Sequence, residues 1–246
     1  MMKDCIFIAM WSGPRNISTA LMRAWENRAD TAVIDEPFYA HYLHQTGSIH
    51  PGQEAIMASQ PTNWQDVAKA ITQPPATGEK IYYQKHMSHH LLNNIDHGWM
   101  DGMRHAFLIR EPAAMIKSYV AARERLDHAD DLGLATQVRL FNEIKEKTGE
   151  TPAVIDSVDV LKNPKGMLQT LCKKLNVPFD EAMLSWPAGK RASDGVWAPY
   201  WYGSVEQSTG FAPYKEKEVT IDPEYADILA ECMPHYETLY DVRLTA

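Results

Sequence analysis

Short runs of strand-forming residues alternate with longer helix-like segments, and this alternation limits the chain to few folds. Strands are expected at residues 5–10, 31–34, 80–84, 105–109 and 153–156. Helices are expected at residues 18–28, 64–71, 112–125, 134–147, 163–175 and 223–240. Strands that are separated by helices form mostly parallel sheets with helices on both faces. The sequence therefore predicts an α/β fold of three layers, with a central, mostly parallel sheet flanked by helices.

Length and composition restrict the classes of function. We expect the 246 residues to form a single domain, because this length suits one core. The net charge of −8 argues against a broad nucleic-acid surface. No apolar run approaches the roughly 18 residues that span a membrane, so we expect no membrane partner. The three widely spaced cysteines fit a reducing cytoplasm, and the sequence leaves the oligomeric state open.

The first predicted strand ends in a loop that leads directly into the first predicted helix. The loop and the helix start comprise Gly13, Pro14, Arg15, Asn16, Ile17, Ser18 and Thr19. Unpaired backbone N–H groups and the helix dipole attract phosphate at such a position. Arg15 adds a full charge, and Ser18 and Thr19 add hydroxyl donors. A phosphate-binding loop is one interpretation, and an ordinary turn capped by Ser18 is the other.

A second group of anion-binding residues follows the fourth predicted strand. Arg110 lies at the carboxyl end of this strand, where ligands collect in open α/β sheets. Ser118 follows eight residues later on the next predicted helix. An arginine and a hydroxyl can hold a phosphate from two sides. An ion pair of Arg110 with Glu111 or with another surface acid is the alternative.

These two segments together resemble the sulfotransferase family. Residues 14–19 occupy the place of that family's loop for the 5′-phosphosulfate, and Arg110 with Ser118 matches its 3′-phosphate element. The resemblance implies a P-loop-type fold and 3′-phosphoadenosine-5′-phosphosulfate as the sulfuryl donor. It also implies a late loop over the adenine and the 3′-phosphate, for which Lys190 and Arg191 are the candidates.

The loop departs from the family pattern at two positions. Ile17 stands where the family usually has glycine, and Asn16 replaces the usual serine. We therefore expect a different backbone path and different phosphate contacts in this loop. The order of the predicted elements still follows the family over most of the chain.

Sulfuryl transfer needs a group that neutralises the leaving oxygen and a base that deprotonates the acceptor. Arg15 is the candidate for the leaving oxygen. Members that resemble this chain use a Glu after the second strand or a His after the third, which here suggests Glu36 or His86. Other histidines of the cluster at residues 86–90 stay open as bases. The reaction requires no metal ion, because the sulfuryl group carries less charge than a phosphoryl group.

The acceptor side is predicted only in outline. Aromatic residues gather at residues 38–42 and 197–211, and such surroundings suit a small organic acceptor that carries a hydroxyl or an amine. Residues 186–213 are expected to form a long ordered loop. A P-loop small-molecule kinase that uses ATP is a rival interpretation, but no Walker lysine follows Ser18. A catalytically inactive nucleotide-binding module is the third interpretation.

Overall fold

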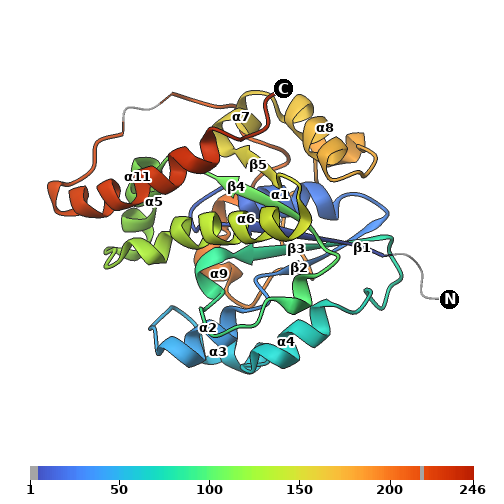
Figure 1. The fold of residues 1–246 in the computed structure, drawn as a ribbon, viewed down its shortest axis with the longest axis horizontal. Coiled ribbons are helices and arrows are strands. Elements are labelled where there is room, and N and C mark those ends of the chain that lie inside the picture. The colour runs from blue at the N-terminus through green and yellow to red at the C-terminus, as the bar shows by residue number, and fades with distance from the viewer. Residues whose placement is uncertain (1–4, 217–218) are drawn as a thin grey trace. The chain divides into compact units, whose positions relative to one another are not determined.

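The strands in the described part of the chain form one five-stranded sheet. A computed structural model describes residues 5–216 and 219–246, so residues 1–4 of the opening segment lie outside the described residues. The strands are β1 (Ile6–Ser12), β2 (Thr31–Asp35), β3 (Ile81–Met87), β4 (Arg104–Ile109) and β5 (Ala153–Asp156). Their order in the sheet is β2-β3-β1-β4-β5 (Figure 1). The β2–β3 and β4–β5 pairs are parallel, and the expected α/β fold is confirmed.

Helices connect these strands, as the alternating sequence pattern predicts. The α-helices are α1 (Ser18–Glu26), α2 (Tyr39–Thr46), α3 (Gln53–Ser59), α4 (Trp64–Ile71), α5 (Pro112–Arg123), α6 (Leu134–Thr148), α7 (Ser157–Lys162), α8 (Pro164–Lys174), α9 (Ala198–Trp201), α10 (Gly203–Glu206) and α11 (Ala226–Tyr240). Short 3-10 helices are η1 (Ser88–His90), η2 (Gly98–Met100), η3 (Ala129–Leu132), η4 (Glu181–Leu184) and η5 (Pro223–Tyr225). Among the described residues no helix is long and apolar enough to cross a membrane.

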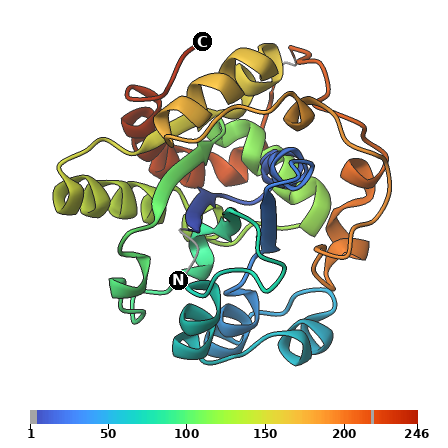
Figure 2. The same ribbon diagram turned by 90° about the vertical axis from the view of Figure 1, so that its right-hand side faces the viewer.

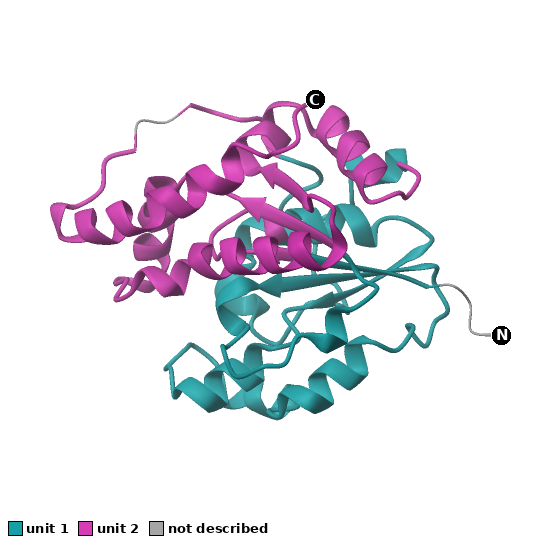
Figure 3. Cartoon of the chain, viewed as in Figure 1, with its two compact units in different colours: residues 1–10, 19–104, 180–211 teal, residues 11–18, 105–179, 212–246 magenta. Residues whose placement is uncertain are grey.

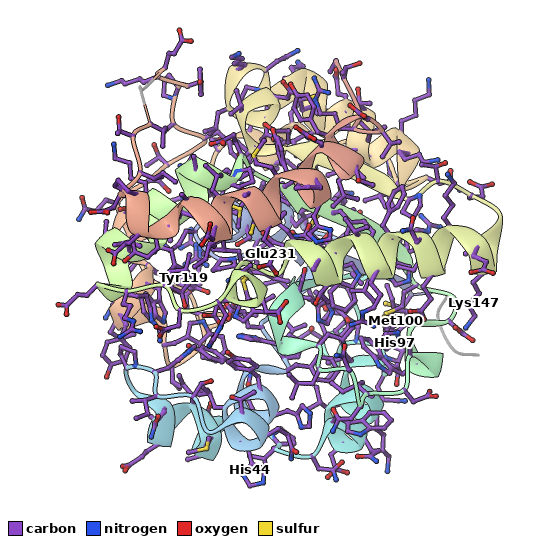
Figure 4. All side chains as sticks on the ribbon, turned by 60° about the vertical axis from the view of Figure 1, so that its left-hand side comes forward. His44, His97, Met100, Tyr119, Lys147 and Glu231 are labelled. Carbon is purple, nitrogen blue, oxygen red and sulfur yellow. The ribbon has the colours of Figure 1, made fainter. Side chains whose placement is uncertain are left out.

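The chain divides into two compact units (Figure 3). Unit 1 consists of residues 1–10, 19–104 and 180–211, and unit 2 of residues 11–18, 105–179 and 212–246. In unit 1, helices α2 and α3 lie side by side and are drawn in blue in Figure 2. In unit 2, α11 packs against α5, α6 and β5. Tyr119 on α5, labelled in Figure 4, is buried in unit 2.

Local sequence explains where several of these helices begin. Glu111 precedes α5, and its carboxylate accepts hydrogen bonds from the backbone N–H groups of Ala113 and Ala114. Pro112 occupies the first turn, where its missing N–H costs nothing. Asn63 caps α4 in the same manner, and Asp156 caps α7. Side-chain caps of this kind fix the start of a helix because they satisfy its free N–H groups.

The structure differs from the sequence-based expectations in several places. Strand β3 continues to Met87, so Lys85 and His86 belong to the strand and do not follow it. Residues 41–76, expected to be less regular apart from a helix at 64–71, also contain α3 and most of α2. Residues 186–213 are not a plain loop, because they contain α9, α10 and a bridge partner of Ser185 at Gly210. Helices of four to eight residues offer little periodicity, so α4 was recognised but α2, α3, α9 and α10 were not.

Candidate functional site

The loop after β1 is held in unit 2 by close packing and by one side-chain hydrogen bond. A Cβ atom at Gly13 would lie 2.4 Å from the carbonyl oxygen of Leu132 and 2.6 Å from Cε of Met115. Only glycine fits at this distance from another backbone segment. Asn16 Nδ2 donates to the carbonyl oxygen of Leu108, at 3.2 Å, and thereby ties the loop to β4.

The loop, β4 and α5 bring three predicted anion-binding side chains together in unit 2. Arg15 Nε donates to Ser118 Oγ at 3.2 Å. Arg110 Nη1 donates to the backbone carbonyl of Arg15 at 2.5 Å. The predicted 5′-phosphosulfate and 3′-phosphate elements are therefore in direct contact through these two bonds. Each of the three residues is half-buried, so each keeps a surface on which an anion can bind.

The two guanidinium groups have no acidic partner within ion-pair distance among the described residues. Burial lowers the pKa of Arg15, and burial together with the charge of Arg15 lowers the pKa of Arg110. Both side chains stay charged, because the ordinary arginine pKa is far above neutral. The nearby Glu111 and Asp156 cap α5 and α7 instead of pairing with Arg110. The site therefore holds two like charges that a bound anion would neutralise.

Lys190 and Arg191, the candidates for the late loop, lie in unit 1. Arg191 Nε is 3.7 Å from Glu26 Oε2 on α1, and its backbone N–H donates to Asp194. Asp194 in turn forms an ion pair with the buried Arg23 of α1, at 2.5 Å. The Lys190 side chain is exposed. This segment is therefore folded onto α1 by ion pairs.

A buried cluster of charged side chains lies where β2 and β3 end in unit 1. Lys85 Nζ contacts Asp35 Oδ1 at 2.8 Å, Glu36 Oε1 at 2.7 Å and Tyr202 Oη at 2.7 Å. Tyr202 Oη donates to Asp35 Oδ2 at 2.6 Å, and Trp197 Nε1 donates to Tyr202 Oη. The parallel pairing places Asp35 directly beside Lys85. Three charges share this cluster, and two of them are negative.

The electrostatics of this cluster single out Glu36. Burial raises the pKa of Glu36, and the charge of Asp35 acts in the same direction while that of Lys85 opposes it. Burial alone would lower the pKa of Lys85, but the charges of Asp35 and Glu36 raise it well above its usual value. Lys85 occupies Oε1 of Glu36, so Oε2 is the oxygen available to a further group. A carboxylate with a raised pKa is a suitable general base.

His86, the second candidate base, occupies a different environment in unit 1. Its side chain alternates with that of Lys85 along β3, which directs the two to opposite faces of the strand. His86 Nε2 lies 3.1 Å from Gln84 Oε1, and the ring packs near Phe38 and Trp99. In the described part of the chain, no three His, Cys, Asp or Glu side chains gather in the manner of a metal site.

The buried contacts of Asp35, Lys85 and Tyr202 were not expected from the sequence. The ion pair between Asp35 and Lys85 could not be predicted, because it depends on the register between β2 and β3. Tyr202 was grouped only with aromatic residues of an expected loop, although it comes into contact with Lys85 from 117 positions away in sequence. The one available signal was a Lys and two acids at the ends of two neighbouring strands.

A family model described as "Sulfotransferase domain" matches residues 6–242. Two curated proteins of Arabidopsis thaliana are similar to the chain. These are branched-chain-amino-acid aminotransferase-like proteins 1 and 2, which are 36% identical over 235 residues and 34% identical over 233 residues. Each match covers 94% of this chain but 41% of the relative, so the chain spans less than half of their length.

Solved structures with a similar fold include three sulfotransferases. A sulfotransferase domain from the curacin biosynthetic pathway has a TM-score of 0.51 and 16% identity, and covers 98% of this chain and 99% of its own. The domain from the Synechococcus PCC 7002 olefin synthase has a TM-score of 0.52, 16% identity and coverage of 98% and 97%. A sulfotransferase from Alicyclobacillus acidocaldarius has a TM-score of 0.55, 11% identity and coverage of 97% and 96%. The TM-scores show a shared fold, and at these identities the likeness extends to the fold alone.

Proposed function

Because the chain belongs to the sulfotransferase-domain family, we propose that it moves a sulfuryl group from 3′-phosphoadenosine-5′-phosphosulfate to a small organic acceptor. The match to the family model confirms the sulfotransferase family expected from the two sequence motifs. The donor nucleotide, the hydroxyl or amine of the acceptor and the residue roles are our proposals. We also propose that the chain acts as a single domain in the cytoplasm without a nucleic-acid partner.

The observation that carries the proposal is the contact between the two predicted anion-binding elements in unit 2. Arg15 donates to Ser118, and Arg110 donates to the backbone of Arg15. A donor with phosphate groups on both the 3′ and the 5′ positions needs two cationic groups close together. We assign the 5′-phosphosulfate to Arg15 and the loop of residues 13–19, and the 3′-phosphate to Arg110 and Ser118. Lys190 and Arg191 are proposed to contact the adenosine portion.

In the proposed reaction the acceptor heteroatom attacks the sulfur in line with the bond to the 5′-phosphate oxygen. That sulfur–oxygen bond breaks, and its electron pair stays on the leaving adenosine 3′,5′-bisphosphate. Arg15 neutralises this developing charge electrostatically, because a guanidinium does not give up its proton. Glu36 Oε2 takes the proton of the acceptor. No metal ion is required, since little charge has to be neutralised on the transferred group.

The choice of Glu36 over His86 as base rests on the two environments. Glu36 keeps one carboxylate oxygen free of Lys85, and burial raises its pKa. His86 is almost completely buried between aromatic rings and hydrogen-bonds to Gln84. A base must reach the proton that it removes, so an oxygen available to a ligand is favoured.

The role of Arg110 can be tested by comparing two nucleotides. The variant Arg110→Ala should bind adenosine 3′,5′-bisphosphate about 10- to 100-fold more weakly, the value of a charge-assisted contact, and 5′-AMP almost unchanged. Isothermal titration calorimetry measures both affinities. Arg243→Ala is a matched control, because Arg243 lies in the same unit but pairs with Asp159 at 2.9 Å. An equal loss of affinity for both nucleotides would contradict the proposal that Arg110 binds the 3′-phosphate.

A further inference from the structure

Three side chains of the buried cluster in unit 1 close a ring of hydrogen bonds. Lys85 Nζ donates to Asp35 Oδ1 at 2.8 Å and to Tyr202 Oη at 2.7 Å, and Tyr202 Oη donates to Asp35 Oδ2 at 2.6 Å. An ammonium only donates and a carboxylate only accepts, so each of these bonds has one possible direction. Tyr202 closes this hydrogen-bond ring, because its hydroxyl is the member that both donates and accepts.

The hydroxyl of Tyr202 has no bonding capacity left for a ligand. Its proton goes to Asp35, and its two lone pairs accept from Lys85 and from Trp197 Nε1, the latter at 3.1 Å. Burial and the charge of Asp35 raise the pKa of Tyr202 well above its usual value, so the hydroxyl keeps its proton. Tyr202 therefore acts on its protein neighbours and does not contact the reacting atoms.

Lys85 links the hydrogen-bond ring to the candidate base. An ammonium group has three N–H donors. Two of those of Lys85 are bound within the ring, and the third goes to Glu36 Oε1 at 2.7 Å. The three N–H bonds of an ammonium diverge at fixed angles, so the two bonds within the ring determine where the third can point.

The carboxylate of Glu36 depends on this single bond. Among the described residues it accepts a hydrogen bond from Lys85 alone. Asp35, by contrast, accepts from the backbone N–H of Gly195 as well as from both partners in the ring. The Glu36 side chain is 10% exposed, and those of Asp35 and Lys85 are 1% exposed. Glu36 is thus the acid of the cluster that a ligand can reach, and Lys85 sets the orientation of its carboxylate.

We propose that Tyr202 is a positioning residue: its hydroxyl fixes Lys85 in the hydrogen-bond ring, so that the remaining N–H of Lys85 holds Glu36 Oε1 and leaves Oε2 to take the proton of the acceptor. This inference rests on the proposed function and adds a residue to it. Tyr202, Lys85 and Asp35 exchange no proton in the reaction. Without the hydroxyl, one N–H of Lys85 loses its partner, and Lys85 is free to turn from Glu36 toward Asp35.

An NMR experiment tests this geometry without any nucleotide or acceptor. The chain is labelled with 15N-lysine and 13C-glutamate, and the scalar coupling across the hydrogen bond between Lys85 Nζ and the carboxyl carbon of Glu36 is measured at neutral pH. The wild-type chain should show the coupling, and Tyr202→Phe should lose at least about half of it, because hydrogen bonds weaken steeply when their geometry changes. No coupling in the wild-type chain, or an unchanged coupling in Tyr202→Phe, overturns the proposal.

Tyr236→Phe is the matched control for this experiment. The hydroxyl of Tyr236 likewise donates to a buried carboxylate, that of Asp156 at 3.1 Å, but both residues belong to unit 2. The control variant should keep the wild-type coupling between Lys85 and Glu36. A loss as large as that in Tyr202→Phe would contradict the proposal.

The rate of sulfuryl transfer tests the functional consequence. In Tyr202→Phe the single-turnover rate, with water as the acceptor, should fall about tenfold, because the base is no longer held in one orientation. Affinity for adenosine 3′,5′-bisphosphate should stay unchanged. Tyr236→Phe should keep both quantities at their wild-type values. An equal loss of rate in the two variants would show a general effect of losing a buried hydroxyl and contradict the proposal.

A double variant shows whether Tyr202 acts through Glu36. The effects of two residues that act as a unit do not add. Adding Tyr202→Phe to Glu36→Gln should therefore leave the rate of Glu36→Gln unchanged, because no base remains to be positioned. A merely structural role of Tyr202 would lower the rate of Glu36→Gln by a further factor of about ten, and that result overturns the proposal.

Failure of the proposed function and failure of the role of Tyr202 can be told apart. If the wild-type chain does not bind adenosine 3′,5′-bisphosphate, the proposed function fails, whatever the couplings of Lys85. If the nucleotide binds but Tyr202→Phe keeps the wild-type coupling and rate, the sulfotransferase proposal stands and the positioning role of Tyr202 falls.

Discussion

Two functional candidates adopt a backbone conformation that side chains other than glycine rarely occupy. Arg15 has a φ of 56° and Glu36 a φ of 40°. Each follows the end of a strand, β1 and β2 respectively. Such conformations cost on the order of 1–3 kcal/mol and persist where the surroundings enforce them, commonly at functional sites. The strain at both residues agrees with the roles that we propose for them.

At this scale the proton-acceptor role of Glu36 gives a sharp prediction. Glu36→Gln keeps the size of the side chain and a carbonyl oxygen for Lys85, but it cannot take a proton. We expect the transfer rate to fall by about 10²- to 10⁴-fold, the usual contribution of a general base. Affinity for adenosine 3′,5′-bisphosphate should change little. Single-turnover kinetics and calorimetry measure the two quantities.

Glu54→Gln provides the control for this substitution, because Glu54 is exposed in the first turn of α3. It should leave both the rate and the nucleotide affinity at their wild-type values. An unchanged rate in Glu36→Gln would instead transfer the role of base to His86 or His89.

At the scale of elements, the loop of residues 13–18 depends on the segment that packs against it. The carbonyl oxygen of Leu132, at the end of η3, lies where a side chain at Gly13 would have to be. Asn16 joins the same loop to β4, and Arg110 joins it from the residue after β4. The phosphate-binding candidates therefore keep their geometry through contacts with η3, with β4 and with the residue that follows β4.

Gly13→Ala should disturb this arrangement. The added methyl group would overlap a backbone oxygen that cannot easily move, so we expect a loss of about 1–3 kcal/mol in the free energy of unfolding. Binding of adenosine 3′,5′-bisphosphate should weaken as well. Urea denaturation and calorimetry check the two effects. Gly203→Ala is the control, because a Cβ atom there would meet nothing within 4 Å. Equal stability of both variants would contradict the packing argument.

The sequence predicts the strands and long helices well, because each carries a clear hydrophobic period. Helix α4 and strand β5 begin and end at the residues expected. Arg15, Arg110 and Ser118 were recognised from short motifs, and in unit 2 Arg15 contacts both of the others. The cluster around Lys85 was not recognised, because its members come from β2, β3 and the segment of α9 and α10. The register and the fold of that segment cannot be inferred from local periodicity.

At the scale of the whole molecule, charge is distributed unevenly. The chain has a net charge of −8, yet two arginines of unit 2 have no acidic partner within ion-pair distance in the described residues. In unit 1, by contrast, Asp35 and Glu36 share the single buried ammonium of Lys85. A small cationic site in an acidic protein attracts a small anionic molecule, whereas the negative charge of the remaining surface repels a long polyanion such as a nucleic acid. This agrees with a doubly phosphorylated nucleoside as the ligand.

The central claim is that unit 2 binds an adenosine with phosphate groups on the 3′ and 5′ positions. Isothermal titration calorimetry of the wild-type chain with adenosine 3′,5′-bisphosphate, and separately with ATP and Mg²⁺, tests it most directly. We predict that the bisphosphate binds at least about tenfold more tightly, a difference of about 1.4 kcal/mol. Tighter binding of ATP with Mg²⁺, or no binding of the bisphosphate, would contradict the account.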